Sequence, residues 1–332
     1  MIQKENRLDG ISILRTVATI GIMLYHVGFG HHYLRSVNFA GGIHIFFCIS
    51  AFLIMHTTRS KTPANFLKRR LVRILPLYLI LTVLTFIAGK FIGDFGQDAG
   101  VPELIKSLLL IPYQRGAIRG DNVIRPIVGS AWTLYYEVWF AFVFCISMKI
   151  KQKYRGIIAA SVCIAAYIAG LFLPADLTVT RLLRTGFLFD FVAGIAAFYI
   201  WDLFLKKIDF RFRFIWALPA AAAIVLFYFG PRYPWLLATE ALAILILTLL
   251  ATYQKPVPKL FNWFSELSYS FYLIHYYAVI VVGFFFDITK LSAKTVIASL
   301  LVFLLTLAAS YVSYILIEKK LCGALNKLIK IK

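Results

Sequence analysis

Repeated apolar runs, each of about 20 residues, constrain the fold of this chain more than any other feature of its sequence. A run of that length crosses the hydrocarbon core of a bilayer as one α-helix, in which every backbone polar group is satisfied internally. The chain is also 61% hydrophobic with a mean hydropathy of +0.81, which is more apolar surface than a soluble chain of 332 residues can bury. We therefore predict an all-α fold, a polytopic transmembrane helical bundle.

The apolar runs predict about ten spans, packed as a single domain over residues 1–332. The expected spans are residues 11–30, 40–57, 72–92, 131–148, 156–173, 182–201, 214–230, 234–252, 264–286 and 295–317. The longest interruption, residues 93–130, is rich in Gly and Pro, and its segment 102–111 predicts a helix too short to cross the membrane. This interruption is either a lid over an acceptor site or a packed plug without a catalytic role.

The basic residues predict how the bundle is oriented. The formal net charge is +20, from 35 Lys and Arg against 15 Asp and Glu. With the N-terminus inside, most of the basic residues fall in cytoplasmic segments, which fits the positive-inside rule and places both termini in the cytoplasm. Topology and attraction to anionic membrane lipids thus explain the basic excess, and nucleic acid is not an expected partner.

The cysteines predict neither a disulfide framework nor a metal site. Cys48, Cys145, Cys163 and Cys322 fall in the expected spans or on the inner side, and no CxxC spacing occurs. We interpret them as small core residues and expect no metal.

Arg15 and His26 lie in the first apolar run, where a cation and an imidazole are costly and usually serve a function. Eleven residues of helix leave their side chains about 20° apart in azimuth and about 16 Å apart along the axis. One helix can thus hold an anion near one membrane face and support acid–base chemistry deeper in. His26 could instead be a hydrogen-bonded packing residue with a purely structural role. The presence of Arg15 on the same face favours a functional role.

Glu137 and His275 are further ionisable residues inside expected spans. Counting residues from the span ends places His26, Glu137 and His275 at matching depths in the outer half of the membrane. We expect these three side chains to form one catalytic site, in which a carboxylate orients an imidazole and stabilises its cation. A structural ion pair between helices would give the same pattern.

Arg70 and Arg73 lie one turn apart at the start of the third span, so their guanidinium groups project together. Such a pair binds phosphate oxygens well, and Arg15 enters the membrane from the same side. The three arginines therefore predict an inner-face site for a nucleotide-like polyanion, with lipid headgroups as the alternative ligand.

Five other side chains are candidates for lining the acceptor site, although each has an ordinary structural explanation as well. Ser50 is expected to form a helix–helix hydrogen bond rather than act as a nucleophile, and aromatic residues also populate the interfacial belt. The candidates are His44, Ser50, Trp132, Tyr136 and Tyr272.

Six segments, taken in order, resemble the acyltransferase type 3 family of bacterial integral-membrane O-acyltransferases, and the resemblance covers essentially the whole chain. Two departures stand out: Ala51 replaces a usual Gly, and His44 stands where the family often has an acid. The segments are Arg15-x10-His26, Phe46-Phe47-x-x-Ser50-Ala51-Phe52-Leu53-Ile54, Arg70-x-x-Arg73, Trp132-Thr133-Leu134-x-x-Glu137-x-x-Phe140, Ser268-Tyr269-Ser270-x-Tyr272-Leu273-x-His275 and Ile317-Glu318-Lys319.

The resemblance implies a multi-pass enzyme of the bacterial cytoplasmic (inner) membrane. It would move an acyl group, acetyl as the first expectation, from cytoplasmic acyl-CoA to a hydroxyl of a surface carbohydrate. Arg15, Arg70 and Arg73 would then hold the acyl-CoA, and His26 would serve as general base or transient acyl carrier. Acetyl-CoA is thus the expected donor, and polysaccharide-assembly proteins are possible partners.

Two rival functions are compatible with the same residues. A transporter of a polysaccharide, a lipid-linked sugar or a small anion would also carry buried ionisable groups, and would move its substrate without an acyl donor. A non-catalytic receptor or assembly factor would tolerate the loss of Arg15 and His26 together.

Overall fold

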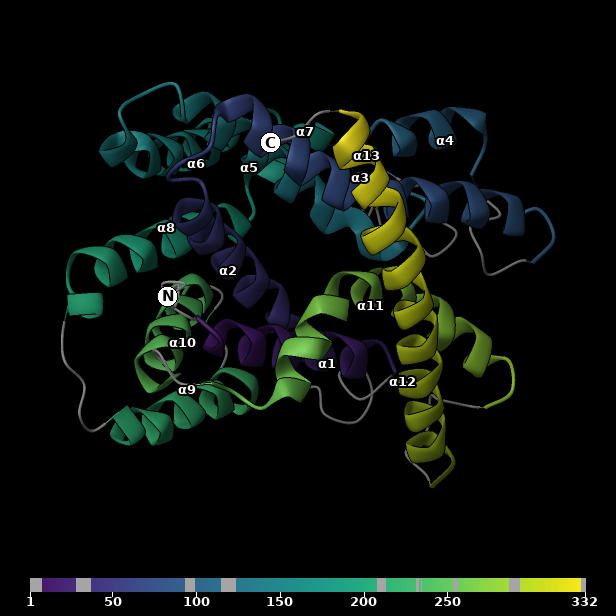
Figure 1. Ribbon diagram of the computed structural model, residues 1–332. Coiled ribbons are helices and arrows are strands. Elements are labelled where there is room, and N and C mark those ends of the chain that lie inside the picture. Colours follow the sequence, from purple (N-terminus) through teal and green to yellow (C-terminus); the bar gives the residue numbers. More distant parts are fainter. Residues whose placement is uncertain are drawn as a thin grey trace. The chain divides into compact units, whose positions relative to one another are not determined.

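The computed structural model describes residues 8–27, 37–92, 99–114, 124–207, 213–230, 233, 235–252, 256–286 and 293–329. Every regular element in these ranges is a helix, apart from one isolated bridge between Gln114 and Ile124, so the all-α prediction is confirmed (Figure 1). The chain divides into two compact units: the first comprises Met1–Arg59 and Gly186–Leu305, and the second comprises Ser60–Thr185 and Thr306–Lys332. The single domain over residues 1–332 stays a prediction.

The first unit is built around α1, which packs against helices from both parts of the chain that form this unit. Its neighbours include α11, α2 and α10, and α2 packs in turn along α8. The helices of this unit are α1 (Gly10–His26), α2 (Gly42–Thr57), α8 (Phe187–Leu203), α9 (Ala217–Phe229), α10 (Leu237–Thr252), α11 (Lys259–Gly283) and most of α12 (Ala293–Ser313).

Helices α2 and α8 run parallel and touch closely. His44 meets Asp190 near their starts, and Arg59 meets Asp202 near their ends. Between these pairs, a Cβ added to Gly194 of α8 would lie 2.1 Å from the backbone oxygen of Cys48. Only glycine permits this approach, which is how small residues stabilise helix pairs in membranes.

The second unit is organised around α3 (Pro63–Ala88), which contacts α4, α5 and the C-terminal helices. Tyr78 of α3 donates a hydrogen bond to the carbonyl of Ser107, so α4 is tied to the long helix, 2.6 Å between the oxygens. The remaining helices of this unit are α4 (Val101–Leu108), α5 (Thr133–Ser147), α6 (Arg155–Phe172), α7 (Thr178–Leu183), a π-helix (Tyr314–Leu321) and α13 (Cys322–Leu328).

The bounds of several helices differ from those of the expected spans, each for a local reason. The third helix begins at Pro63 rather than residue 72, because Thr62 accepts a hydrogen bond from the backbone of Asn65 and Pro63 suits the first turn. Within the expected span 182–201, α7 ends at Leu183 and α8 begins at Phe187, and Arg184 between them donates to the carbonyls of Gly170 and Leu173 at the end of α6. The expected short helix at 102–111 exists, but it ends at Leu108.

Each predicted span corresponds to a helix, although the first span's end at residues 28–30 lies outside the described residues. Among the described helices, five segments are long and apolar enough to cross a membrane: Phe39–Thr57, Pro63–Ala88, Gln152–Phe172, Thr178–Leu203 and Ala293–Leu328. Three shorter apolar helices are Gly10–His26, Ala217–Phe229 and Leu237–Thr252. Ten crossings and cytoplasmic termini stay predictions.

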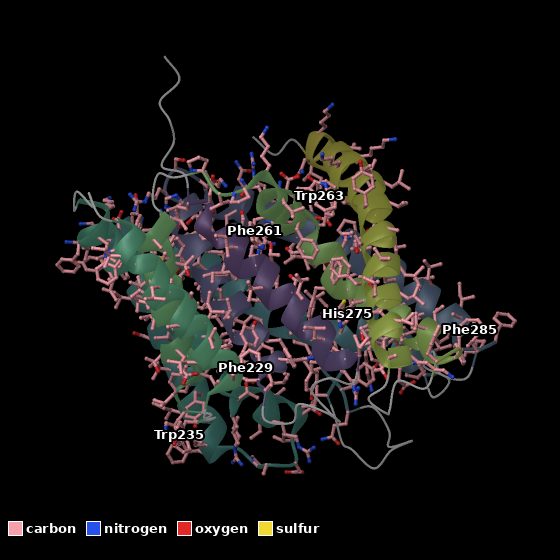
Figure 2. All side chains as sticks on the ribbon, turned by 90° about the horizontal axis from the view of Figure 1, so that it is seen from below. Phe229, Trp235, Phe261, Trp263, His275 and Phe285 are labelled. Carbon is pink, nitrogen blue, oxygen red and sulfur yellow. The ribbon has the colours of Figure 1, made fainter. Side chains whose placement is uncertain are left out.

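Large aromatic side chains lie towards two opposite ends of the first unit. Phe261 and Trp263 at the start of α11 lie towards one end in Figure 2, and Phe229 and Trp235 lie towards the other. His275 lies between these levels and is buried. The arrangement is typical of aromatic residues at the two membrane–water interfaces.

We expect Gly194→Ala to destabilise the protein. The new methyl group would collide with the backbone of Cys48, and overpacking of this kind lowers the free energy of unfolding by about 1–3 kcal/mol. The measurement is the midpoint of thermal unfolding of the detergent-solubilised protein. Gly283→Ala is the matched control, because a Cβ there meets nothing within 4 Å. Equal midpoints for the two variants would contradict this account of the α2–α8 contact.

Candidate functional site

His26 and His275 lie side by side in the first unit. The last residue of α1 brings its ring to 5.1 Å from the ring of His275 on α11, centre to centre, with the planes tilted by 46°. Tyr276 adds an edge-on contact to His26 at 5.7 Å, and Tyr25 adds another at 5.2 Å. The structure thus brings together two of the three predicted catalytic residues, with aromatic rings around them.

The hydrogen bond of His275 determines which of its nitrogens is a base. Nδ1 lies 2.6 Å from the carbonyl oxygen of Tyr272, one turn earlier in α11. A carbonyl can only accept, so Nδ1 carries the proton and Nε2 of the neutral ring has a lone pair. Nε2 is buried and has no hydrogen-bond partner among the described residues. The 1% exposed side chain therefore presents an unused base beside His26.

The end of α1 affects the charge of His26. The carbonyl groups at a helix C-terminus carry a partial negative charge, which stabilises a cation in the last turn. His26 occupies that turn, and its ring is half-buried. Its position therefore favours a transient imidazolium, which a general base forms when it takes a proton.

Arg15 lies on the same helix as His26. Since α1 is unbroken from Gly10 to His26, the two side chains share one face, about three turns apart. Arg15 is half-buried. The helix thus gives Arg15 and His26 the expected separation, and their roles in anion binding and acid–base chemistry stay predictions.

Tyr272, one of the expected lining residues, lies beside this pair. The ring of Tyr272 lies 5.9 Å from that of His275, and Phe46 of α2 contacts Tyr272 at 6.3 Å. Ser50 is buried one turn further along α2. These contacts connect α2 to the histidine pair through one aromatic side chain.

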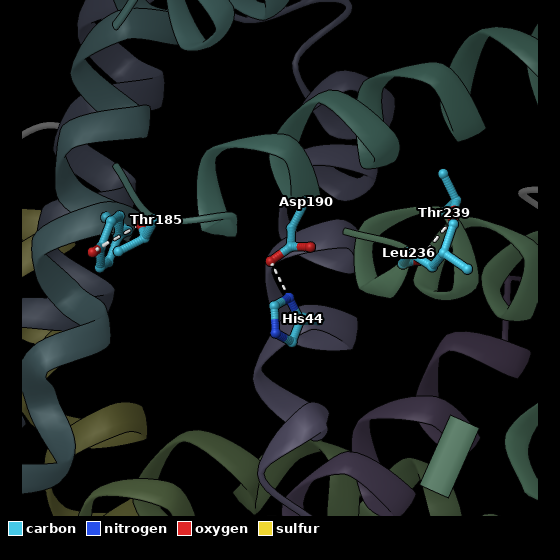
Figure 3. A network of polar contacts seen from close by, with 6 residues as sticks. His44, Thr185, Asp190, Leu236 and Thr239 are labelled. Atoms are coloured by element: carbon cyan, nitrogen blue, oxygen red, sulfur yellow. Dashed lines mark hydrogen bonds and ion pairs between the residues drawn. The ribbon is translucent and has the colours of Figure 1, made fainter. Parts of the chain in front are cut away.

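His44 belongs to a second polar group of the first unit, as Figure 3 shows. Its Nδ1 lies 2.8 Å from Oδ2 of Asp190 on α8, and the Asp190 side chain is 0% exposed. Sequence reasoning missed Asp190. A lone carboxylate inside an expected span was the available signal, by the same rule that singled out Arg15 and His26.

Arg70 and Glu137 form an ion pair within the second unit. The guanidinium of Arg70 on α3 binds the carboxylate of Glu137 on α5, and their side chains are 18% and 15% exposed. The observed partner of Glu137 is thus an arginine, and its predicted role beside the two histidines stays a prediction. A carboxylate in this position orients a guanidinium for a further ligand.

Positive charge gathers around the start of α3. Burial lowers the pKa of Lys61 from its usual value, and the nearby Arg69 guanidinium lowers it further. Arg73 is exposed on α3 and lies near Cys322 of α13, as does Glu318 of the π-helix. Crowded cations of this kind attract anions.

The remaining expected lining residues, Trp132 and Tyr136, contact each other in the second unit. Their rings meet edge to face at 6.0 Å. The Tyr136 hydroxyl donates to the carbonyl of Leu182 and accepts from the hydroxyl of Thr185, at 3.3 and 3.1 Å. Both positions are thus held by contacts between α5 and the α7 segment.

Across the described ranges, no group of three or more His, Cys, Asp or Glu side chains is arranged to hold a metal ion.

Comparison with known proteins identifies the class of the chain. The acyltransferase type 3 family model, described as an acyltransferase domain, matches residues 8–315. The exopolysaccharide production protein ExoZ of Rhizobium meliloti (strain 1021) is 30% identical over 183 residues, which cover 54% of this chain and 56% of the relative. The chain therefore spans about half the length of this curated relative. No solved structure matches it.

Reversing the charges of the Arg70–Glu137 pair tests whether it stabilises the second unit. Arg70→Glu or Glu137→Arg alone puts two like charges together, and we expect a loss of about 3 kcal/mol in unfolding free energy. The double reversal restores the ion pair, and we expect it to recover most of the lost unfolding free energy. The measurement is the thermal midpoint of each purified variant.

Lys149→Glu provides the control, because it reverses an exposed charge of the same unit and should leave the midpoint nearly unchanged. A double reversal no more stable than the single ones would show that the two side chains do not act as a pair.

Proposed function

Because the chain belongs to the acyltransferase type 3 family, we propose that it transfers an acyl group from cytoplasmic acyl-CoA to a hydroxyl of an extracytoplasmic carbohydrate. Acetyl-CoA is the proposed donor, and the bacterial cytoplasmic membrane is the proposed location. The similarity to a protein named for exopolysaccharide production supports a polysaccharide as the acceptor.

The observation that carries the proposal is the paired imidazoles of His26 and His275. Acyl transfer to a hydroxyl needs a base, because the hydroxyl must lose its proton as it attacks. The pair supplies two imidazoles that contact aromatic side chains. The Nε2 lone pair of His275 accepts no hydrogen bond from the described residues.

In the proposed step, the acceptor oxygen attacks the thioester carbonyl carbon while His26 takes its proton. The new C–O bond forms and the C–S bond breaks, so coenzyme A leaves as a thiolate. The imidazolium then returns the proton to that sulfur, and the products are an ester and free coenzyme A. Nε2 of His275 accepts a hydrogen bond from a neighbouring hydroxyl of the same sugar, which orients the acceptor while the attacking hydroxyl donates to His26.

Arginine side chains are proposed to bind the donor phosphates. Arg15 in the first unit is one candidate, and Arg70 and Arg73 in the second unit are separate candidates, because a guanidinium group binds phosphate oxygens bidentately. Glu137 orients Arg70 for this task. Each arginine is open to a separate test by substitution.

The test of the proposed function is transfer of label from radioactive acetyl-CoA to polysaccharide by the purified protein in lipid nanodiscs. The polysaccharide is taken from cells that lack the gene, so that its hydroxyls are unacylated. A transporter would leave the polysaccharide unlabelled while moving substrate across a vesicle membrane.

We expect His26→Ala to lower kcat by about 100-fold or more, the usual contribution of a general base. We expect His275→Asn to lower kcat strongly while the protein remains folded. The amide of Asn can still donate to the carbonyl of Tyr272, but it has no lone pair at the position of Nε2. The readouts are kcat for acetyl transfer and the thermal midpoint.

His56→Gln is the control for these substitutions, since His56 is another histidine of the same unit and stacks on Phe52 near the end of α2. It should keep full activity. A His26→Ala protein that is folded and fully active would contradict the proposed mechanism.

We expect Arg15→Gln to raise KM for acetyl-CoA by roughly 10- to 100-fold, the equivalent of one lost charge-assisted contact to phosphate. The KM of Arg15→Lys for acetyl-CoA should lie between those of wild type and Arg15→Gln, because lysine keeps the charge but not the bidentate geometry. Lys151→Gln removes an exposed cation away from the basic start of α3 and serves as control. An unchanged KM for Arg15→Gln would remove this residue from the donor site.

A further inference from the structure

Three helices of the first unit place a polar side chain in their first turns at one end of the unit. His44 comes from α2, Asp190 from α8 and Glu240 from α10, and both other helices pack against α8. Glu240 is half-buried and interacts electrostatically with His44. Trp235, two residues before α10, is exposed and stands at the edge of this unit in Figure 2. The three groups thus lie near a membrane–water boundary, which a water-soluble carbohydrate can reach.

Stability does not explain the burial of Asp190. Its side chain is 0% exposed, and only Oδ2 has a donor, the imidazole of His44. Oδ1 is buried and has no hydrogen-bond partner within the described part of the chain. A buried carboxylate with one unsatisfied oxygen costs free energy, and such groups concentrate at functional sites.

The effect of Asp190 is to orient His44. A carboxylate accepts, so Nδ1 of His44 donates and Nε2 of the neutral ring is left as an acceptor. The ring of Phe187 lies 5.0 Å from the imidazole and restricts its plane. His44 is 13% exposed, in contrast to its buried partner. The ring therefore presents Nε2 in a fixed direction.

This group lies on a different face of α2 from the histidine pair. Gly42 packs against Ala18 and Ile22 of α1, and Phe46 contacts Tyr272 of α11. His44 instead contacts α8 (Figure 3). Two residues of helix rotate a side chain by about 200°, which explains the separation. A ligand at His44 is thus not the group that reacts beside His26.

We propose that His44, positioned by Asp190 and assisted by Glu240, forms a carbohydrate subsite that binds a sugar unit of the acceptor other than the one acylated. This inference rests on the proposed function. Imidazole nitrogen and carboxylate oxygens accept hydrogen bonds from sugar hydroxyls, and the contact to a charged carboxylate is a strong one. The three groups do not have metal-site geometry among the described residues.

A remote subsite affects acceptor binding and not the chemical step. In nanodiscs, we expect Asp190→Asn and His44→Gln to raise KM for the polysaccharide about tenfold, with kcat and KM for acetyl-CoA unchanged. The tenfold figure corresponds to one lost hydrogen bond in the binding site. Monosaccharides released from the same polysaccharide serve as the second acceptor, and their KM should not change.

Asp202→Asn is the matched control, because Asp202 is another aspartate of α8 and pairs with Arg59 and Lys206. It should leave the KM for polysaccharide as in wild type. Thermal midpoints of all three variants are measured together with the kinetics.

An unchanged KM for polysaccharide in both test variants would overturn the subsite. A general loss, in which kcat falls for both acceptors together with the thermal midpoint, would also overturn it, since that is the behaviour of a structural pair. If the wild-type protein labels no acceptor, the proposed function itself fails. If it labels the polysaccharide and the variants keep its KM, only the subsite fails.

Discussion

The cost of placing polar side chains in an apolar interior governs this structure. Each buried imidazole or carboxylate needs a partner, and the choice of partner decides which atoms remain for chemistry. His275 donates a hydrogen bond from Nδ1 to the Tyr272 carbonyl within its own helix, whereas His44 donates one from Nδ1 to the Asp190 carboxylate of another helix. In both residues the consequence is an imidazole with a fixed Nε2 lone pair.

Close helix packing makes these arrangements rigid. The absent side chain of Gly194 lets α2 and α8 approach until their backbones nearly touch, one turn away from the His44–Asp190 hydrogen bond. Helices in lipid gain little from the hydrophobic effect when they associate, so close van der Waals packing at small residues stabilises the contact instead. The same contact that stabilises the helix pair thus also positions the polar group at its end.

The two units contribute different chemistry. The first holds the paired imidazoles of His26 and His275 and the His44–Asp190 group, which suit acid–base work and hydroxyl recognition. The second holds the Arg70–Glu137 pair and the basic start of α3, which suit a polyanion. The imidazole pair thus belongs to one unit and the basic segment to the other.

The sequence alone determined the helical class, the approximate position of every long helix and the ionisable residues worth examining, because hydropathy and the cost of intramembrane charge are local properties. It also placed Arg15 and His26 on one face, since helical geometry depends only on spacing. Which residues became neighbours was decided by tertiary structure: Glu137 met Arg70, and His44 met the overlooked Asp190. The physical reason is that partner choice depends on how helices far apart in the chain rotate and pack, and spacing along one helix contains no information about the face of another.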